Sequence, residues 1–222
     1  MKALAFARLS LIAYRQGNYQ AAHTWLNESI TMAKKLPDIE RNECLAFALN
    51  VHGRVFKDEH NNQEAKRAFQ EALMYAELAG VKKRAGWALR GLGQIAEAEG
   101  DTSAAKVFHT RSLEIAEQIE NLREIAAQRD SLGLIAMAEG DVALARQYFQ
   151  KSLELRRGGG NRNGMCECYM NLGRLEEGAD NTKAAISHWE KAKQLATEIS
   201  SKKHERRATE ALARLRPKEV QG

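Results

Sequence analysis

The feature that most constrains this chain is an internal repeat with a period of 40 residues. The segment Ala96–Asp101 (AEAEGD) recurs as Ala136–Asp141 (AMAEGD), and Ser112-Leu113-Glu114 recurs as Ser152-Leu153-Glu154, both 40 residues later. Two series of small residues keep the same period of 40: Gly53, Gly93, Gly133 and Gly173, then Ala65, Ala105, Ala145 and Ala185. A fixed period of this length is the signature of a stacked repeat architecture.

A fifth copy lies upstream of these four. Ser10 stands at its glycine place and Ala22 at its alanine place, 43 residues before the next copy. We place the three additional residues around Leu36-Pro37-Asp38, because proline and aspartate favour a loop.

The spacing of apolar residues predicts two helices in each copy. In the third copy, Leu89, Leu92 and Ala96 share one helix face, Gly100-Asp101 interrupts the pattern, and Ala105 resumes it. Glycine can adopt the left-handed dihedrals that close a helix, and aspartate can cap the next one. The other breaks are Gly17-Asn18 and Gly140-Asp141, with His60-Asn61 and Asp180-Asn181 expected to use asparagine's tolerance of positive φ.

The small residues have a predicted purpose in packing. Glycine on the first helix and alanine on the second let the two helix axes approach closely. A larger residue follows each alanine by four positions and is expected to fill the space beside the hairpin: Leu26, Phe69, His109, Phe149 and Trp189. Because one hairpin cannot cover its own apolar face, stacked neighbours must supply the core.

Composition agrees with an all-helical chain. Only 6% of the 222 residues are aromatic, two are proline, and 28% are charged. The net charge of +5 weakly favours acidic partners, and acidic and basic residues alternate, as in Glu205-Arg206-Arg207. Such alternation is typical of a solvated helix surface, whereas nucleic-acid binders concentrate their basic residues.

The repeat resembles the tetratricopeptide repeat (TPR) family, whose signature is Leu-Gly in the first helix, then alanine, an aromatic four residues later, and Ala-Leu. Leu92-Gly93, Leu132-Gly133 and Leu172-Gly173 match the first element, and Ala65, Phe69, Ala72 and Leu73 match the second. The 40-residue period is similar to the longer variant of Leu-Gly-Asn adaptors and of sensor regions in bacterial regulators. The copies depart from the family in lacking its closing proline, and copies three to five also lack the aromatic of the first helix.

The resemblance implies an all-α fold, a right-handed α-solenoid of about five stacked helical hairpins with a C-terminal capping helix. We expect residues 1–222 to be a single domain with repeats at 3–38, 41–80, 82–120, 122–160 and 162–200. The hairpin helices are expected at 3–16 with 20–35, 41–58 with 62–79, 83–99 with 102–119, 123–139 with 142–157, and 163–178 with 182–199. A polar helix at 203–215, ending at Pro217, is expected to cap the solenoid. The amino end has no comparable cap, which suggests either the tail of a longer protein or a surface covered by another molecule.

No catalytic, metal or cofactor site is expected. The six histidines have no histidine partner at i+3 or i+4, and Cys166 and Cys168 point apart on a helix. The three glycines Gly158–Gly160 lack the Lys-Ser/Thr of a nucleotide loop, so we interpret them as a helix end and a joint. No long apolar segment or secretory leader is present, which makes the cytoplasm the expected location.

The resemblance also implies a binding face, since first helices line the concave side of TPR solenoids. The family's contact places hold Asn50, Arg54 and Lys57, then Arg90, Gln94 and Glu97, then Asp130, Leu134 and Met137, and then Met170, Arg174 and Glu177, with Asn171 beside Met170. Several are basic, which suggests an acidic protein or peptide partner. The chaperone-binding clamp is not matched, because Ala7 and Leu11 replace its lysine and asparagine, and Leu11 with Tyr14 suggests an apolar end.

Three functions remain open from the sequence. The first is a protein-interaction scaffold or regulatory sensor module that holds a peptide or partner in its groove. The second is a nucleic-acid-binding solenoid, which requires a continuous positive stripe and steep salt dependence. The third is a small-molecule sensor, which requires a closed apolar pocket near Leu134 and Met137.

Overall fold

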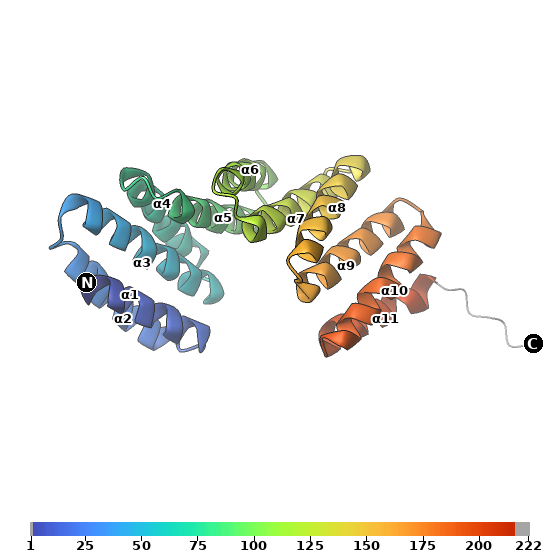
Figure 1. Ribbon diagram of the computed structural model, residues 1–222, viewed down its shortest axis with the longest axis horizontal. Coiled ribbons are helices and arrows are strands. Elements are labelled where there is room, and N and C mark those ends of the chain that lie inside the picture. Colours follow the sequence, from blue (N-terminus) through green and yellow to red (C-terminus); the bar gives the residue numbers. More distant parts are fainter. Residues whose placement is uncertain (1, 216–222) are drawn as a thin grey trace, which may run out of the picture. The chain divides into compact units, whose positions relative to one another are not determined.

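The computed structural model describes residues 2–215, and this part of the chain is built from eleven α-helices without a strand (Figure 1). The all-α expectation is confirmed. The helices are α1 (Lys2–Arg15), α2 (Tyr19–Ala33), α3 (Asp38–Asp58), α4 (Asn62–Leu78), α5 (Lys82–Glu99), α6 (Thr102–Gln118), α7 (Leu122–Ala138), α8 (Val142–Gly158), α9 (Arg162–Gly178), α10 (Thr182–Glu198) and α11 (Lys202–Leu215).

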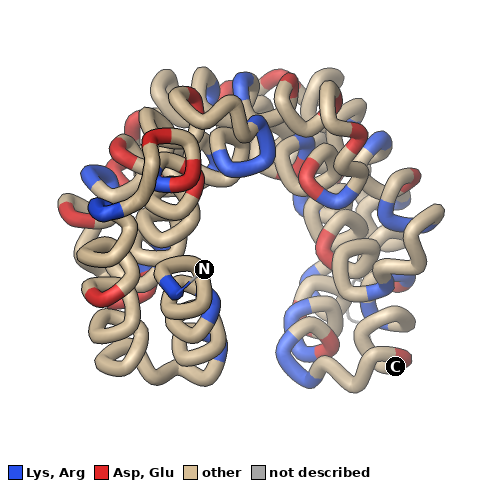
Figure 2. The backbone as a smooth tube through the Cα atoms, turned by 60° about the vertical axis from the view of Figure 1, so that its left-hand side comes forward, with Lys and Arg blue, Asp and Glu red and all other residues tan. Residues whose placement is uncertain are grey.

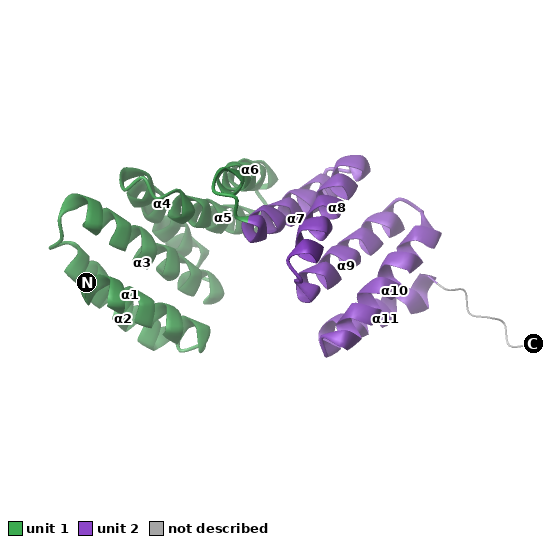
Figure 3. Cartoon of the chain, viewed as in Figure 1, with its two compact units in different colours: residues 1–121 green, residues 122–222 purple. Residues whose placement is uncertain are grey.

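The chain forms two compact units (Figure 3), residues 1–121 and residues 122–222, called unit 1 and unit 2 below. In unit 1, α1 packs with α2, α3 with α4, and α5 with α6, while α2–α3 and α4–α5 contacts join successive hairpins. In unit 2, α7 packs with α8 and α9 with α10, and the α8–α9 and α10–α11 contacts join them. Each unit is therefore a row of hairpins.

The hairpin turns follow the chemistry expected of Gly-Asp. Gly100 and Gly140 have φ of +78° and +82°, and the carboxylates of Asp101 and Asp141 accept the Ala104 and Leu144 amides, both at 2.9 Å. At the two turns without glycine, the asparagine expectation is wrong. His60 (φ +61°) and Asp180 (φ +57°) take the left-handed conformation. The asparagines follow them as N-cap residues of α4 and α10, where φ must be negative.

Each repeat glycine lies against the large residue of its own hairpin. A Cβ added at Gly133 would lie 2.6 Å from Phe149 Cε1, and one added at Gly93 would lie 2.6 Å from His109 Nε2. Gly53 with Phe69 and Gly173 with Trp189 repeat this arrangement at 2.7 and 2.8 Å. Besides letting the helices approach, the glycine makes room for one specific ring.

The serine of the recurring Ser-Leu-Glu motif joins the two helices of its hairpin. The hydroxyl of Ser112 donates to the Gly86 carbonyl, and that of Ser152 to the Ala126 carbonyl, both at 3.0 Å. Ser29 donates to the Ala3 carbonyl at 2.8 Å in the same manner. In each case the bond crosses from the second helix of a hairpin to the first, which stabilises their pairing.

The largest difference from the predicted helix boundaries lies at the start of α3. Helix α3 begins at Asp38, three residues earlier than predicted, because Pro37 is suited to the helix start and Asp38 and Glu40 favour the first turn.

In α11, Ala208, Ala211 and Leu212 are buried while Arg206 and Arg207 are exposed, as expected for a capping helix. Pro217, its predicted end, lies outside the described residues. None of the described helices combines the length and apolar character needed to cross a membrane.

Candidate binding surfaces

Eight of the predicted contact residues are divided between the two units, so two surfaces are described separately. Unit 1 holds five on α3 and α5: Asn50, Arg54, Lys57, Arg90 and Gln94. Unit 2 holds three on α7 and α9: Asp130, Asn171 and Arg174.

Four of the unit 1 residues, Arg54, Lys57, Arg90 and Gln94, form what we call the basic surface of unit 1. The Lys57 ammonium donates to Gln94 Oε1 at 2.8 Å and thereby joins α3 to α5. Burial lowers the pKa of Lys57, and the positive charges of Arg90 and Arg54 lower it further, against the opposing effects of Asp58 and Glu97. Lys57 is therefore close enough to both arginines for their positive charges to oppose its own.

On the amino-terminal side of this surface, Arg54 contacts Tyr14 of α1. Its guanidinium lies over the Tyr14 ring of α1, 4.5 Å from the ring centre, and the Tyr14 hydroxyl donates to Asp58 at 2.7 Å. Burial raises the pKa of Tyr14, and so does the hydrogen bond to Asp58. Tyr14 thus supports Arg54 through a cation–π contact, and Leu11 packs against the neighbouring core cluster.

Asn50, the fifth predicted residue, is turned inward. It is buried, and its amide donates to the Ala46 carbonyl at 2.8 Å and to the Arg84 carbonyl at 3.2 Å. The second bond fastens α3 to α5. Its side chain therefore contributes to the pairing of these helices, while its role in binding a partner stays a prediction.

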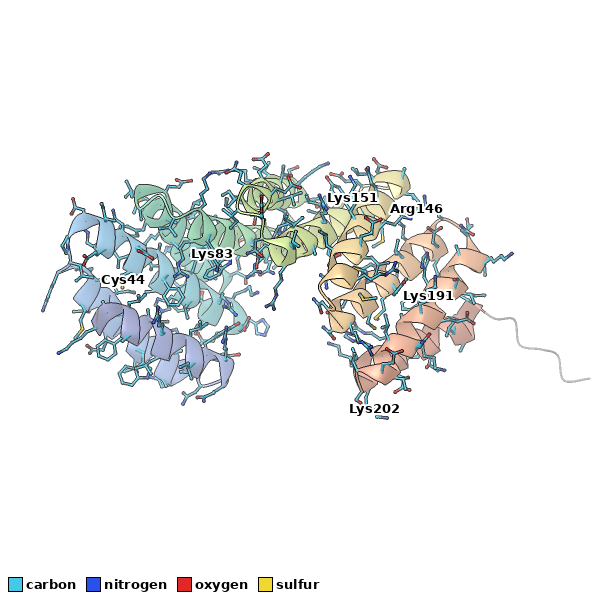
Figure 4. All side chains as sticks on the ribbon, viewed as in Figure 1. Cys44, Lys83, Arg146, Lys151, Lys191 and Lys202 are labelled. Atoms are coloured by element: carbon cyan, nitrogen blue, oxygen red, sulfur yellow. The ribbon has the colours of Figure 1, made fainter. Side chains whose placement is uncertain are left out.

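A cationic and aromatic group that the sequence did not predict lies earlier on α5 and contacts α3. The Arg84 guanidinium lies over Phe47 at 4.2 Å and over Trp87 at 5.0 Å, with Lys83 (labelled in Figure 4) 5.4 Å from Trp87. Burial lowers the pKa of Arg84, and Arg8 of α1 lowers it further. The available signal was the spacing of Arg84, Trp87 and Arg90, which are three residues apart and share a helix face.

In unit 2, Asp130 belongs to an interior ion pair. Its carboxylate contacts the guanidinium of Arg156 on α8, and the Cys168 thiol donates to it at 3.4 Å. Burial raises the pKa of Asp130 while Arg156 lowers it. The Asp130 side chain is only 14% exposed, so this residue mainly joins α7, α8 and α9.

Asn171 and Arg174 contact each other on α9. The guanidinium of Arg174 donates to the Asn171 amide oxygen, and Asn171 is itself buried. Burial lowers the pKa of Arg174, and Arg207 of α11 lowers it further. Arg174 and Arg207 therefore form a second site of positive charge, close to Glu177, which accepts from Arg214 at 3.3 Å.

The remaining reactive side chains have structural surroundings. Cys44, Cys166 and Cys168 are free and buried, and burial raises the pKa of Cys168 to about 12. Within residues 2–215, no group of three or more His, Cys, Asp or Glu side chains is placed to hold a metal ion. Leu134 and Met137 pack against the core of unit 2, and a ligand pocket there stays a prediction.

Comparison with known proteins identifies the repeat. Two family models described as tetratricopeptide repeat match the chain, one at residues 3–36 and one at residues 123–198. A comparison with curated protein sequences finds no match.

Solved structures with a similar fold cover most of the chain. BtubC (BKLC) from P. vanneervenii has a TM-score of 0.76 at 15% identity, over 88% of this chain and 80% of that one. A signal transduction ATPase with numerous domains (STAND) and a tetratricopeptide repeat sensor, from Pyrococcus horikoshii, has a TM-score of 0.77 at 17% identity, over 93% and 31%. A Rap protein complexed with competence and sporulation factor has a TM-score of 0.73 at 14% identity, over 95% and 61%. At such identities the likeness shows the fold alone, and this chain spans about a third of the ATPase.

Proposed function

Because the chain is a tetratricopeptide repeat protein, we propose that it acts as a protein-interaction or sensor module whose first helices bind an acidic segment of a partner. The proposal places recognition on the basic surface of unit 1. Two solved relatives in fold are consistent with such a role: one carries a repeat sensor within a larger ATPase, and the other is complexed with competence and sporulation factor.

The observation that carries the proposal is the collection of like charges by α3 and α5. Arg54 and Arg90 both lie close enough to Lys57 for their positive charges to oppose its own, and Asp58 and Glu97 offset part of this repulsion. A partner with carboxylates would remove this repulsion and replace it with attraction. Gln94 adds a side-chain amide that can exchange hydrogen bonds with an extended backbone.

Aromatic residues beside the cations add a second element of recognition. Trp87 is partly exposed next to Arg84, and Tyr14 lies beneath Arg54. Rigid aromatic side chains lose little conformational entropy when they contact a ligand. We therefore expect the bound segment to combine carboxylates with apolar residues.

A peptide selection tests this function. We would select binders from a random displayed peptide library on the whole chain and measure the strongest ones by calorimetry. The selected peptides are expected to be acidic, and Arg54→Glu with Arg90→Glu is expected to weaken them by about 1–3 kcal/mol per lost charge contact.

The matched control reverses two charges on second helices. Arg67→Glu and Arg111→Glu make the same change in net charge, on exposed residues of α4 and α6. These substitutions should leave the affinity within experimental error. Peptides of neutral or basic composition, or equal losses in both double variants, would reject the basic surface of unit 1 as the binding site.

A further inference from the structure

Helix α1 exposes a row of apolar side chains. Leu9 is 41% exposed and Ile12 is 51% exposed, and with the exposed Ala5 they form one stripe along the helix. Phe6 lies at the edge of this stripe and stacks on Trp25 of α2 with ring centres 5.3 Å apart. We call Ala5, Phe6, Leu9 and Ile12 of α1, together with Trp25 of α2, the α1 surface. It points away from α3, because α1 turns Leu4, Leu11 and Tyr14 toward the core shared with α3.

The equivalent places in later copies are buried or partly buried. Ala48, His52 and Val55 correspond to Ala5, Leu9 and Ile12, 43 residues later, and Ala88, Leu92 and Ile95 follow after another 40. In unit 2 the same places hold Gln128, Leu132 and Ile135, then Cys168, Leu172 and Leu175, then Ala208, Leu212 and Leu215.

Within each unit, the row of a later hairpin packs against the second helix of the hairpin before it. Leu92 and Ile95 lie in one cluster with Ala65 and Phe69 of α4. Leu172 and Leu175 lie in one cluster with Ala145 and Phe149 of α8. The α1 surface therefore has the side-chain pattern of an inter-hairpin interface, but within residues 2–215 no helix covers it.

The repeated interface specifies the shape of what fits. Every covering helix presents an alanine and, four residues later, a large apolar side chain. The pairs are Ala22 with Leu26, Ala65 with Phe69, Ala145 with Phe149, and Ala185 with Trp189. The matching occupant of the α1 surface is accordingly an amphipathic helix with a small residue and a large apolar residue four positions apart.

The charge expected of this occupant differs from that of the chain's own covering helices. In three interfaces the residue after the alanine is basic or histidine and contacts a glutamate of the next helix: His23 with Glu59 at 2.9 Å, Lys66 with Glu99 at 2.7 Å, and Arg146 with Glu176 at 2.7 Å. Directly after α1, Gln16 stands where Glu59 stands in the second copy, and α1 itself carries Lys2, Arg8 and Arg15 but no acidic residue.

Arg8 strengthens this difference. It is exposed at the place where Val51 and Gly91 are buried in the second and third copies. A covering helix with a cation after its alanine, as in a second copy of this chain, would bring positive charge to Arg8 and Arg15. A helix with carboxylates would instead pair with them.

We propose that the α1 surface docks an acidic amphipathic helix of a different protein. This helix carries a small residue and a large apolar residue four positions apart on its apolar face, flanked by glutamate or aspartate. The surface is distinct from the basic surface of unit 1, so the chain would bind two partner segments through separate helix faces.

The probe is a lactam-bridged peptide with the sequence of α4, residues 62–78, in which Lys66 and Arg67 are replaced by glutamate. Circular dichroism first establishes that it is helical, since short isolated helices are marginal. Binding of the labelled peptide to the whole chain is followed by fluorescence anisotropy. Leu9→Gln with Ile12→Gln is expected to weaken it by at least about tenfold.

Two controls make the test specific. Met74→Gln with Val107→Gln removes two exposed apolar side chains from second helices of the same unit and should not change binding. The peptide with its natural Lys66 and Arg67 should bind more weakly than the acidic one. Arg54→Glu with Arg90→Glu should leave this binding unchanged, which distinguishes it from the proposed binding to the basic surface.

Three results would overturn the proposal. They are failure of the helical acidic peptide to bind, equal binding by the Leu9/Ile12 variant, and tighter binding of the basic peptide than of the acidic one. Sedimentation of the wild-type chain as a dimer that the Leu9→Gln and Ile12→Gln changes dissociate would assign the surface to a second copy instead.

Discussion

The contact between a repeat glycine and its ring makes a sharp prediction at the scale of one residue. Gly133→Ala would bring a methyl group to 2.6 Å from Phe149 Cε1, and the Phe149 ring is completely buried. Since the ring has no free space to move into, we expect this change to lower the free energy of unfolding by about 1–3 kcal/mol. Urea unfolding followed by circular dichroism measures it.

The first copy indicates how the loss can be repaired. It has Ser10 at the glycine place and Leu26 at the ring place, so a side chain at the first is compatible with a smaller one at the second. Phe149→Leu should therefore be less harmful in the Gly133→Ala background than alone. Gly158→Ala, whose added Cβ meets nothing within 4 Å, is the control. Additive effects in the double-mutant cycle would contradict the contact.

The sequence predicts some features of individual side chains and not others. The period located the glycines and the large residues, because packing repeats every 40 positions. It could not show that Asn50 and Asn171 are turned inward, since that depends on contacts with residues that the period does not relate to them. Position on a helix face predicted proximity for Arg54, Lys57 and Gln94, but not exposure for every member of the face.

At the scale of elements, the α2–α3 joint contains a histidine pair that neither helix reveals alone. His23 Nδ1 of α2 lies 3.0 Å from His52 Nε2 of α3, and Glu59 lies 2.9 Å from the other His23 nitrogen. The Phe56 ring stacks on His52 with ring centres 4.2 Å apart. Burial, with the neighbouring His23 charge, lowers the pKa of His52 from 6.5 to about 4, against a smaller opposing effect of Glu59.

This pair predicts a stability that depends on pH. The fold favours neutral His52, so the unfolded chain binds the proton more readily between pH 6.5 and about 4. The contribution is complete above pH 6.5 and is lost as the pH decreases through that window. His52→Leu, which introduces the residue found at Leu92 in the next copy, should flatten this part of the stability profile.

Urea unfolding at a series of pH values measures the slope, with His204→Gln on α11 as a control outside the cluster. Glu176, whose pKa is lowered first by its hydrogen bond with Arg146, gives a further loss toward acid in wild type and variant alike. The informative quantity is therefore the difference between the two profiles. Parallel profiles would show that His52 takes up its proton equally in the folded and unfolded chain.

Helix boundaries were predicted best where turn chemistry is local. Gly100-Asp101 and Gly140-Asp141 end one helix and cap the next through their own backbone and side chains. Helix α3 begins three residues before its predicted start, because proline is compatible with a helix start as well as with a loop. Left-handed turns at His60 and Asp180 show that the tight hairpin can impose positive φ on residues other than glycine and asparagine.

At the scale of the whole chain, the distribution of charge favours the proposed protein partner over nucleic acid. The net charge is +5, but Lys and Arg alternate with Asp and Glu along each unit (Figure 2). Many cations are already engaged, as Lys66 is with Glu99 and Arg162 with Glu198. Phosphate binding depends on the number of cations that meet the backbone together, and pairing with carboxylates reduces that number.

We therefore expect the whole chain to bind a labelled single-stranded oligonucleotide no more tightly than about 10⁻⁶ M at physiological salt, the range of non-specific binding. Anisotropy titrations at several salt concentrations measure the affinity and its slope. Charge reversal at Arg54 and Arg90 should affect selected acidic peptides far more than the oligonucleotide, because only a defined ligand depends on a few particular cations. If the oligonucleotide instead binds with submicromolar affinity, and this double variant abolishes that binding, the basic surface of unit 1 is better explained as a nucleic-acid site.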